Sequence, residues 1–159
     1  MVSQGIRRLD RGGWSLLELM VVVAVIGILT AIGYPVLAGY VRSATVRAGT
    51  QEMRTALLQA KQLAITRRQN ICVQPVAVPF PGYQFQRNAP GGAAIVMPGT
   101  DGTGTFRLQN TATVGLISPG PPCFTPLGAA APAGGFQVTG PAGNFLTINV
   151  SAAGRITTP

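Results

Sequence analysis

The chain begins with an almost unbroken apolar run near its N-terminus. From Trp14 to Tyr34 the polar residues are Ser15, Glu18 and Thr30. A helix over this run, at about 1.5 Å per residue, is roughly 32 Å long, which matches the hydrocarbon core of a bilayer. An aromatic residue stands at each end, as is common at membrane interfaces. The pattern predicts a membrane-spanning helix over residues 14–40.

A second helical pattern follows the first. Pro35 lacks a backbone N–H and has Gly33 and Gly39 close to it, so we expect a kink or local melting over residues 33–39. Beyond this point apolar residues recur at helical spacing, opposite a row of glutamines and threonines, which predicts an amphipathic helix over residues 41–70. Its apolar face consists of Val46, Met53, Ala56, Leu57, Ala60, Leu63 and Ala64.

The pattern changes again after Asn70. Short apolar runs alternate with glycine and proline, which predicts antiparallel strands. The runs lie at residues 71–76, 83–86, 94–97, 105–109, 113–118, 135–138 and 145–150. We expect a hairpin loop at 98–105 and a long irregular loop at 118–135. The predicted fold class is α+β: a long N-terminal helix packed on a small antiparallel β-sheet head at residues 71–159.

The composition argues against an enzyme. The 159 residues include 12 Lys and Arg, 4 Asp and Glu and no His, giving a formal net charge of +8. The acids are Asp10, Glu18, Glu52 and Asp101, and no two are close in sequence. General acid–base catalysis usually needs His or paired carboxylates, and metal sites need clustered ligands. We therefore expect no catalytic residues, no metal and no cofactor, and interpret Asp101 as a turn residue.

Glu18 leaves three interpretations of the N-terminal segment. In the first, the run is a secretory signal peptide cut at residues 30–33. In the second it is a plain membrane anchor, in which Glu18 has no role and costs several kcal/mol. In the third, a leader is cut between Gly13 and Trp14, and the apolar run is retained.

The third interpretation gives Glu18 a role. Cleavage would create an α-amine at Trp14, about 6 Å along the helix axis from Glu18. The two charges could pair within one chain or between staggered neighbouring chains. A buried charge costs much less when it is paired. Glu18 would therefore favour side-by-side packing of many copies.

The stretch GGWSLLELMVVVAVIGILTAIGYP resembles the processing site of type IV prepilins and type II secretion pseudopilins. Gly13 matches the glycine before the cut, Trp14 replaces the usual N-methylated Phe, Glu18 matches the family's glutamate and Pro35 its helix-bending proline. The resemblance implies the type IV pilin fold, removal of leader 1–13 by a prepilin peptidase and N-methylation at Trp14. It also implies a single pass through the bacterial inner membrane, with the head in the periplasm.

Two further stretches are similar to the GspH/FimT-like branch of pilins. One is ALLQAKQLAITRRQNICVQ, and the other is the C-terminal FLTINVSAAGRITTP, where Gly154 and Arg155 match a Gly-Arg turn. Thr157 stands where DNA-binding members have a second Arg. The resemblance implies a minor pseudopilin or minor pilin that supports filament assembly and protein secretion. Its partners would be other pilins and the inner-membrane assembly platform. The alternative is a DNA-binding minor pilin for DNA uptake in natural transformation.

The sequence leaves two interpretations open for each of two sets of residues. Cations seven residues apart form a stripe along the second helix, either a solvated flank or a groove for phosphates or acidic partner subunits. The stripe is Arg47, Arg54, Lys61 and Arg68, with Arg155 as a further candidate contact. The two cysteines, Cys72 and Cys123, either form a disulfide that adds up to about 4 kcal/mol of stability or remain thiols.

Overall fold

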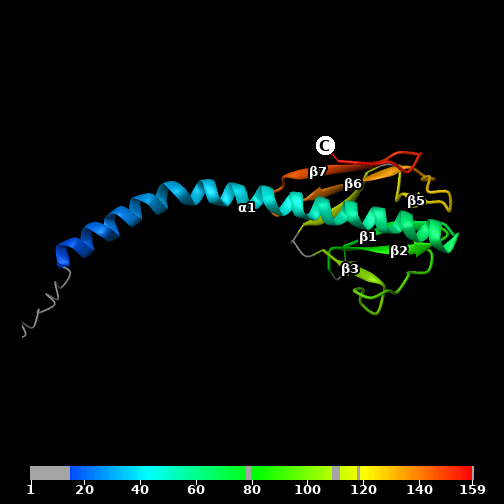
Figure 1. Cartoon of the computed structure of the whole chain (residues 1–159), viewed down its shortest axis with the longest axis horizontal. Coiled ribbons are helices and arrows are strands. Elements are labelled where there is room, and N and C mark those ends of the chain that lie inside the picture. Colours follow the sequence, from blue (N-terminus) through cyan, green and yellow to red (C-terminus); the bar gives the residue numbers. More distant parts are fainter. Residues whose placement is uncertain (1–14, 78–79, 109–111, 118, 159) are drawn as a thin grey trace, which may run out of the picture. The chain divides into compact units, whose positions relative to one another are not determined.

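The computed structural model describes residues 15–77, 80–108, 112–117 and 119–158. The chain divides into two compact units, Met1–Ala38 and Gly39–Pro159, and one helix, α1 (Leu16–Arg67), supplies residues to both (Figure 1). Ser15 caps this helix, because its Oγ accepts a hydrogen bond from the backbone N–H of Leu17 at 3.3 Å. The predicted sites Gly13 and Trp14 lie outside the described residues.

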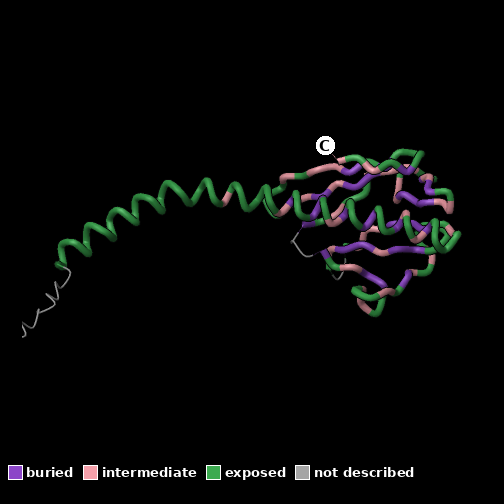
Figure 2. The backbone as a smooth tube through the Cα atoms, viewed as in Figure 1, coloured by how far each residue is buried: buried purple, intermediate pink, exposed green. Residues whose placement is uncertain are grey.

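In the first unit, α1 exposes its large apolar side chains (Figure 2). This part of α1 is long and apolar enough to cross a membrane. Pro35 lies inside the helix, and the helical assignment continues unbroken through residues 33–39. The expected local melting is therefore wrong, since the missing proline N–H removes one hydrogen bond without ending the helix. The bend at Pro35 stays a prediction.

The second unit contains two four-stranded antiparallel sheets. The first has the order β3-β2-β1-β5, formed by β1 (Ile71–Val76), β2 (Gly82–Arg87), β3 (Thr105–Arg107) and β5 (Cys123–Phe124). The second has the order β4-β6-β7-β8, formed by β4 (Thr113–Ile117), β6 (Gly134–Thr139), β7 (Phe145–Val150) and β8 (Ile156–Thr157). The predicted antiparallel head is confirmed, although it consists of two sheets.

The core of the head lies between one face of α1 and both sheets (Figure 2). Of the predicted apolar face, Leu63 is partly buried and the other members are buried. All of them except Val46 pack in one cluster with the fully buried Phe85, Phe124 and Phe136, which come from both sheets. Thr50 is also buried, and its hydroxyl donates to the carbonyl of Val46 at 2.7 Å, so its polar group is satisfied.

Two predicted features of the head are wrong. Residues 94–97 do not form a strand, because they make a single isolated bridge, Gln86 with Ala94, before a turn begins. Ile95 is nevertheless buried and donates its N–H to the carbonyl of Phe85. In the expected irregular loop at 118–135, β5 pairs with β1, so this loop contains an ordered edge of the first sheet.

The disulfide between Cys72 and Cys123 is present. The two residues face each other across the β1–β5 pair, with their Cα atoms 3.9 Å apart, and both are buried. A two-residue strand gains little from its own hydrogen bonds, so the covalent link fixes β5 to the sheet. Of the two alternatives for the cysteines, the bridge is confirmed.

Candidate functional site

The first candidate site is the start of α1. Glu18 lies in the first helical turn and is exposed, as are Leu17 and Leu19 on either side of it. A carboxylate at a helix N-terminus interacts favourably with the helix dipole, which stabilises this turn. The surrounding apolar surface has no covering within the part of the chain that the structure describes. A carboxylate in such a surface is suited to meet a cation from another molecule.

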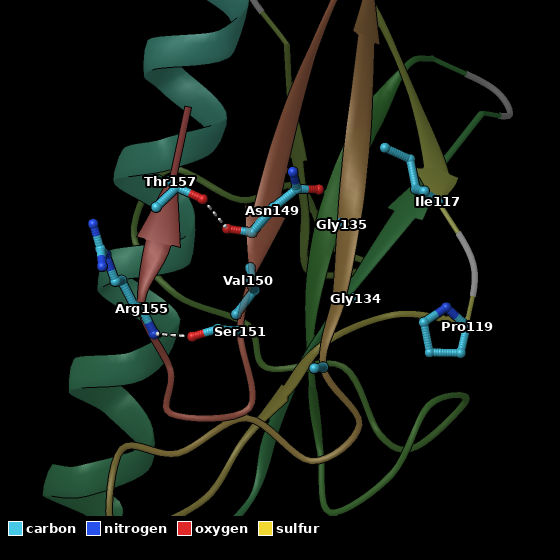
Figure 3. Close-up of a pocket in the computed structure, with 10 residues that line it drawn as sticks. Ile117, Pro119, Gly134, Gly135, Asn149, Val150, Ser151, Arg155 and Thr157 are labelled. Atoms are coloured by element: carbon cyan, nitrogen blue, oxygen red, sulfur yellow. Dashed lines mark hydrogen bonds between the residues drawn. The ribbon is translucent and has the colours of Figure 1, made fainter. Parts of the chain in front are cut away.

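The second candidate site is the turn between β7 and β8, which presents Arg155 (Figure 3). Ser151 and Arg155 close this turn with two hydrogen bonds. The Ser151 N–H donates to the Arg155 carbonyl at 3.0 Å, and the Arg155 N–H donates to the Ser151 hydroxyl at 3.2 Å. Gly154 has a φ of 72°, and a Cβ at this position would collide with the carbonyl oxygen of Gly128. The turn therefore requires glycine before Arg155.

Lys61 joins this turn to α1. Its ammonium donates a hydrogen bond to the carbonyl oxygen of Gly154 at 2.9 Å. Its Cε also borders Gly128, where an added Cβ would lie 3.1 Å away. Lys61 and Arg155, which are far apart in sequence, thus meet at one turn. Lys61 has a structural contact that sequence spacing alone did not predict.

An open hollow of about 610 Å³ lies beside the same turn. It is lined by Ile117, Pro119, Ala133, Gly134, Gly135, Asn149, Val150, Ser151, Arg155 and Thr157. Arg155 is the one basic residue among these lining residues, and in Figure 3 its side chain extends away from Ile117 and Pro119. The lining contains no acid, and the hydroxyl of Ser151 is engaged with the backbone of the turn. Sequence analysis missed this hollow, since small loop residues carry no strong signal.

Three of the four residues of the predicted cationic stripe lie in line on α1, and the fourth does not. Arg47 and Arg54 are exposed on α1, and Lys61 is half-buried. Arg68 follows the last residue of the helix and has a φ of 50°, so it leaves the helical register. The structure therefore keeps Arg47, Arg54 and Lys61 in line and separates Arg68 from them.

Asp101 acts as a turn residue. Its Oδ1 accepts hydrogen bonds from the N–H and hydroxyl of Thr103 and from the N–H of Thr105, at 2.7 to 2.9 Å. The Thr103 hydroxyl and these backbone groups hold the pKa of Asp101 below its usual value. Within the described residues, no three His, Cys, Asp or Glu side chains gather where they could hold a metal ion.

A buried aromatic group lies on the first sheet. The rings of Tyr83 and Phe106 stack with their centroids 5.1 Å apart, and Phe85 contacts both. Burial, with a smaller contribution from the charge of Glu52, raises the pKa of Tyr83 to about 12. A phenol held neutral in this way supports packing and cannot serve as a base near neutral pH.

Comparison with known proteins gives one match to the N-terminal segment and several matches to the fold. Residues 9–34 match the prokaryotic N-terminal methylation motif. The fold is similar to that of the type IV minor pilin FimU of Pseudomonas aeruginosa, with a TM-score of 0.51 and 19% identity, covering 76% of this chain and 92% of that one. It is also similar to the minor pseudopilin EpsH of the type 2 secretion system of Vibrio cholerae. Here the TM-score is 0.52 and the identity 12%, covering 72% of this chain and 95% of that one. No curated protein matches the sequence significantly.

The chain therefore combines a prepilin-type N-terminus with a pilin-like fold. One long N-terminal helix packs on antiparallel sheets, as in the two similar structures. The motif ends at Tyr34, just before Pro35, and the helix that carries it continues into the head. This is a type IV pilin-like architecture, with an N-terminal helix long and apolar enough to cross a membrane.

Proposed function

We propose that this chain is a structural minor subunit, a minor pilin or pseudopilin, of a type IV pilus or type II secretion filament. The observation that carries the proposal is the joining of the methylation motif at residues 9–34 to a helix that continues into a pilin-like head. The subunit supports filament assembly and, in a secretion system, protein transport. It is not a catalyst.

The finer steps of this proposal follow the resemblance of the N-terminus. A prepilin peptidase removes residues 1–13 by cutting between Gly13 and Trp14, and Trp14 is then N-methylated. Residues 14–40 anchor the subunit in the inner membrane, and residues 41–70 and the head at 71–159 face the periplasm. The inner-membrane assembly platform then moves the subunit into the filament.

Glu18 is the proposed assembly residue. Its position in the first turn of α1, within an exposed apolar surface, supports pairing with the Trp14 amine of a neighbouring subunit. In the apolar filament core the pair would satisfy both charges, whereas a subunit out of register would bury each alone. The pairing would therefore set the stagger between subunits.

The DNA-binding alternative gains no support from the motif or from the two similar structures. Arg155 remains a proposed contact for a protein partner, and it lies at the rim of the neighbouring hollow. Thr157, where a second Arg would stand, instead donates its hydroxyl to the carbonyl of Asn149 at 3.4 Å. The turn thus presents one cation where a clamp on phosphates would need two.

Intact mass spectrometry of the membrane-extracted protein tests the proposal. We expect a chain that starts at Trp14, with or without one added methyl group, and that copurifies with filaments. A chain that starts at Tyr34 would indicate ordinary signal-peptide cleavage and would overturn the proposal. A full-length chain in cells with an active prepilin peptidase would also contradict it.

A further inference from the structure

Part of α1 within the head carries a seam with a seven-residue repeat, exposed at every position except the half-buried Lys61. Its residues are alternately four and three positions apart, which is the spacing of a coiled-coil contact line. The seam residues are Arg47, Gln51, Arg54, Leu58, Lys61 and Ile65. Cations and apolar residues alternate in its second half. A helix that merely faces solvent does not need apolar side chains at these positions.

The apolar members of the seam are open to solvent. Leu58 is 49% exposed and Ile65 is 47% exposed, whereas Leu57 and Ala64, one position before each, are 0% exposed. Figure 2 shows exposed positions recurring along α1 within the head. The face of α1 that packs on the sheets is therefore formed by other residues, and the apolar seam residues lie outside it.

Hollows border one end of the seam, and a loop borders the other. Arg47 lines one hollow of about 430 Å³ with Tyr40 and Ala44, and another of about 410 Å³ with Gln51 and Leu146. At the other end Gly128 lies against Lys61 and Ile65, and the neighbouring Leu127 is 94% exposed. The apolar surface thus extends from the helix onto the adjacent loop.

We propose that this seam is the docking surface for an acidic amphipathic helix of a different subunit. Carboxylates of the partner, repeated every seven residues, would face Arg47, Arg54 and Lys61, and its apolar residues would cover Leu58 and Ile65. The inference rests on the proposed function in one respect, which is that the partner is taken to be a subunit of the same filament. The charge and spacing of the seam define the chemistry of the partner independently of that source.

A second copy of this chain does not fit the seam. Two copies in contact along it would place Arg and Lys against Arg and Lys, and like charges at an interface are costly. The described part of the chain also offers no acidic helix, since α1 contains two acids, Glu18 and Glu52. From Gly39 onward the sequence contains 9 basic residues and 2 acidic ones, which favours an acidic partner of another sequence.

Nucleic acid fits the seam less well than a helix does. Phosphate contacts need cations but gain nothing from the exposed Leu58, between Arg54 and Lys61, or from Ile65 beyond Lys61. Apolar residues at coiled-coil spacing are instead what a partner helix requires.

Peptide binding to the full chain in detergent micelles tests the inference. The probe is a labelled helical peptide with Glu and Leu at alternating four- and three-residue spacing. The control peptide has the same composition with the Glu residues moved off this spacing, and empty micelles report partitioning. The protein variants are Arg54→Glu and Leu58→Asp, with Arg87→Glu as the matched control, because Arg87 is exposed on β2 and is not part of the seam.

We expect the spaced peptide to bind in a salt-sensitive way, and Arg54→Glu and Leu58→Asp each to weaken binding about tenfold. Arg87→Glu should leave binding within about twofold of the unmodified chain. Equal binding of both peptides, or an equal effect of Arg87→Glu, would overturn the inference. Double-stranded DNA that binds more tightly than the peptide, and that loses affinity in Arg54→Glu but not in Leu58→Asp, would assign the seam to nucleic acid instead.

The test is separable from that of the proposed function. A chain that starts at Trp14 and copurifies with filaments, but binds neither peptide, would refute the docking seam alone. A chain that is cut at Tyr34 but binds the spaced peptide through Arg54 and Leu58 would refute the filament role and leave the seam in place.

Discussion

Lys61 and Gly154 are joined by a hydrogen bond from the lysine ammonium to the glycine carbonyl oxygen, 2.9 Å long. The two residues lie 93 positions apart in the sequence. The bond fixes the β7–β8 turn, and with it Arg155, against α1. A residue expected to belong to a cationic stripe therefore also holds together two distant parts of the head.

Replacing Lys61 tests this contact. Lys61→Met keeps much of the alkyl stem but leaves the Gly154 carbonyl without its donor. We expect the free energy of unfolding of the head to fall by about 1 to 2 kcal/mol. Denaturant titration of the full chain in detergent, followed by circular dichroism, measures the change. Arg54→Met on the same face is the control, with an expected effect within about 0.5 kcal/mol, and equal losses in both variants would contradict the role of the hydrogen bond.

The disulfide should contribute strongly to the stability of the head. Cys72→Ala combined with Cys123→Ala removes a link that closes a sequence separation of 51 residues. We expect a loss of up to about 4 kcal/mol, mainly because the unfolded chain gains freedom. The denaturation midpoint of this variant is compared with those of the oxidised and the reduced unmodified chain. Reduction that leaves the midpoint unchanged would show that β5 holds to β1 without the bond.

Tyr83 should make the head less stable at high pH. Burial raises its pKa from 10.0 to about 12, so the unfolded chain loses this proton before the folded chain does. The contribution of Tyr83 to the free energy of unfolding is fully present below pH 10. It is lost as pH rises toward about 12, because over this range the unfolded state binds fewer protons than the folded state. Denaturation midpoints across this range, compared with those of Tyr83→Phe, measure the effect. An identical pH profile in the variant would show that other groups cause the loss.

Glu18 should matter for assembly and not for insertion. Glu18→Ala removes the carboxylate that would pair with a neighbouring amine, while the apolar helix still partitions into the membrane. We expect normal amounts of the variant in the membrane fraction and little in sheared filaments, both measured by immunoblotting. Thr30→Ala is the control, since the Thr30 hydroxyl bonds within its own helix, to the Ile26 carbonyl at 2.7 Å. Normal incorporation of Glu18→Ala would refute the pairing.

Local pattern was enough to predict the helix and most strands. The predicted strand at residues 71–76 coincides with β1, because its β-branched residues and the turn signals around it agree. The periodicity of Val46, Met53, Leu57 and Ala60 identified the buried face of α1, since helical geometry alone decides which side chains share a side. The motif around Glu18 was likewise readable, because it depends on spacing along one helix.

The local sequence pattern did not predict the long-range contacts. The strand β5 lies in a proline- and glycine-rich loop whose local signals favour irregular structure, and it forms where Cys123 meets Cys72 across the sheet. The division of the strands between two sheets depends on pairing partners far apart in sequence, which no local preference encodes. The bond from Lys61 to Gly154 exists only once the second sheet has packed on α1.

The sequence by itself determined the apolar anchor, the acid at its start and the prepilin-type motif, since each depends on residue type and spacing within one helix. Only the tertiary structure decided which strands pair, that Lys61 contacts the turn that carries Arg155, and that Leu58 and Ile65 stay exposed. Those features follow from the packing of α1 on two sheets. There, residues that are distant in sequence decide which side chains are buried, and the local periodicity of apolar residues does not.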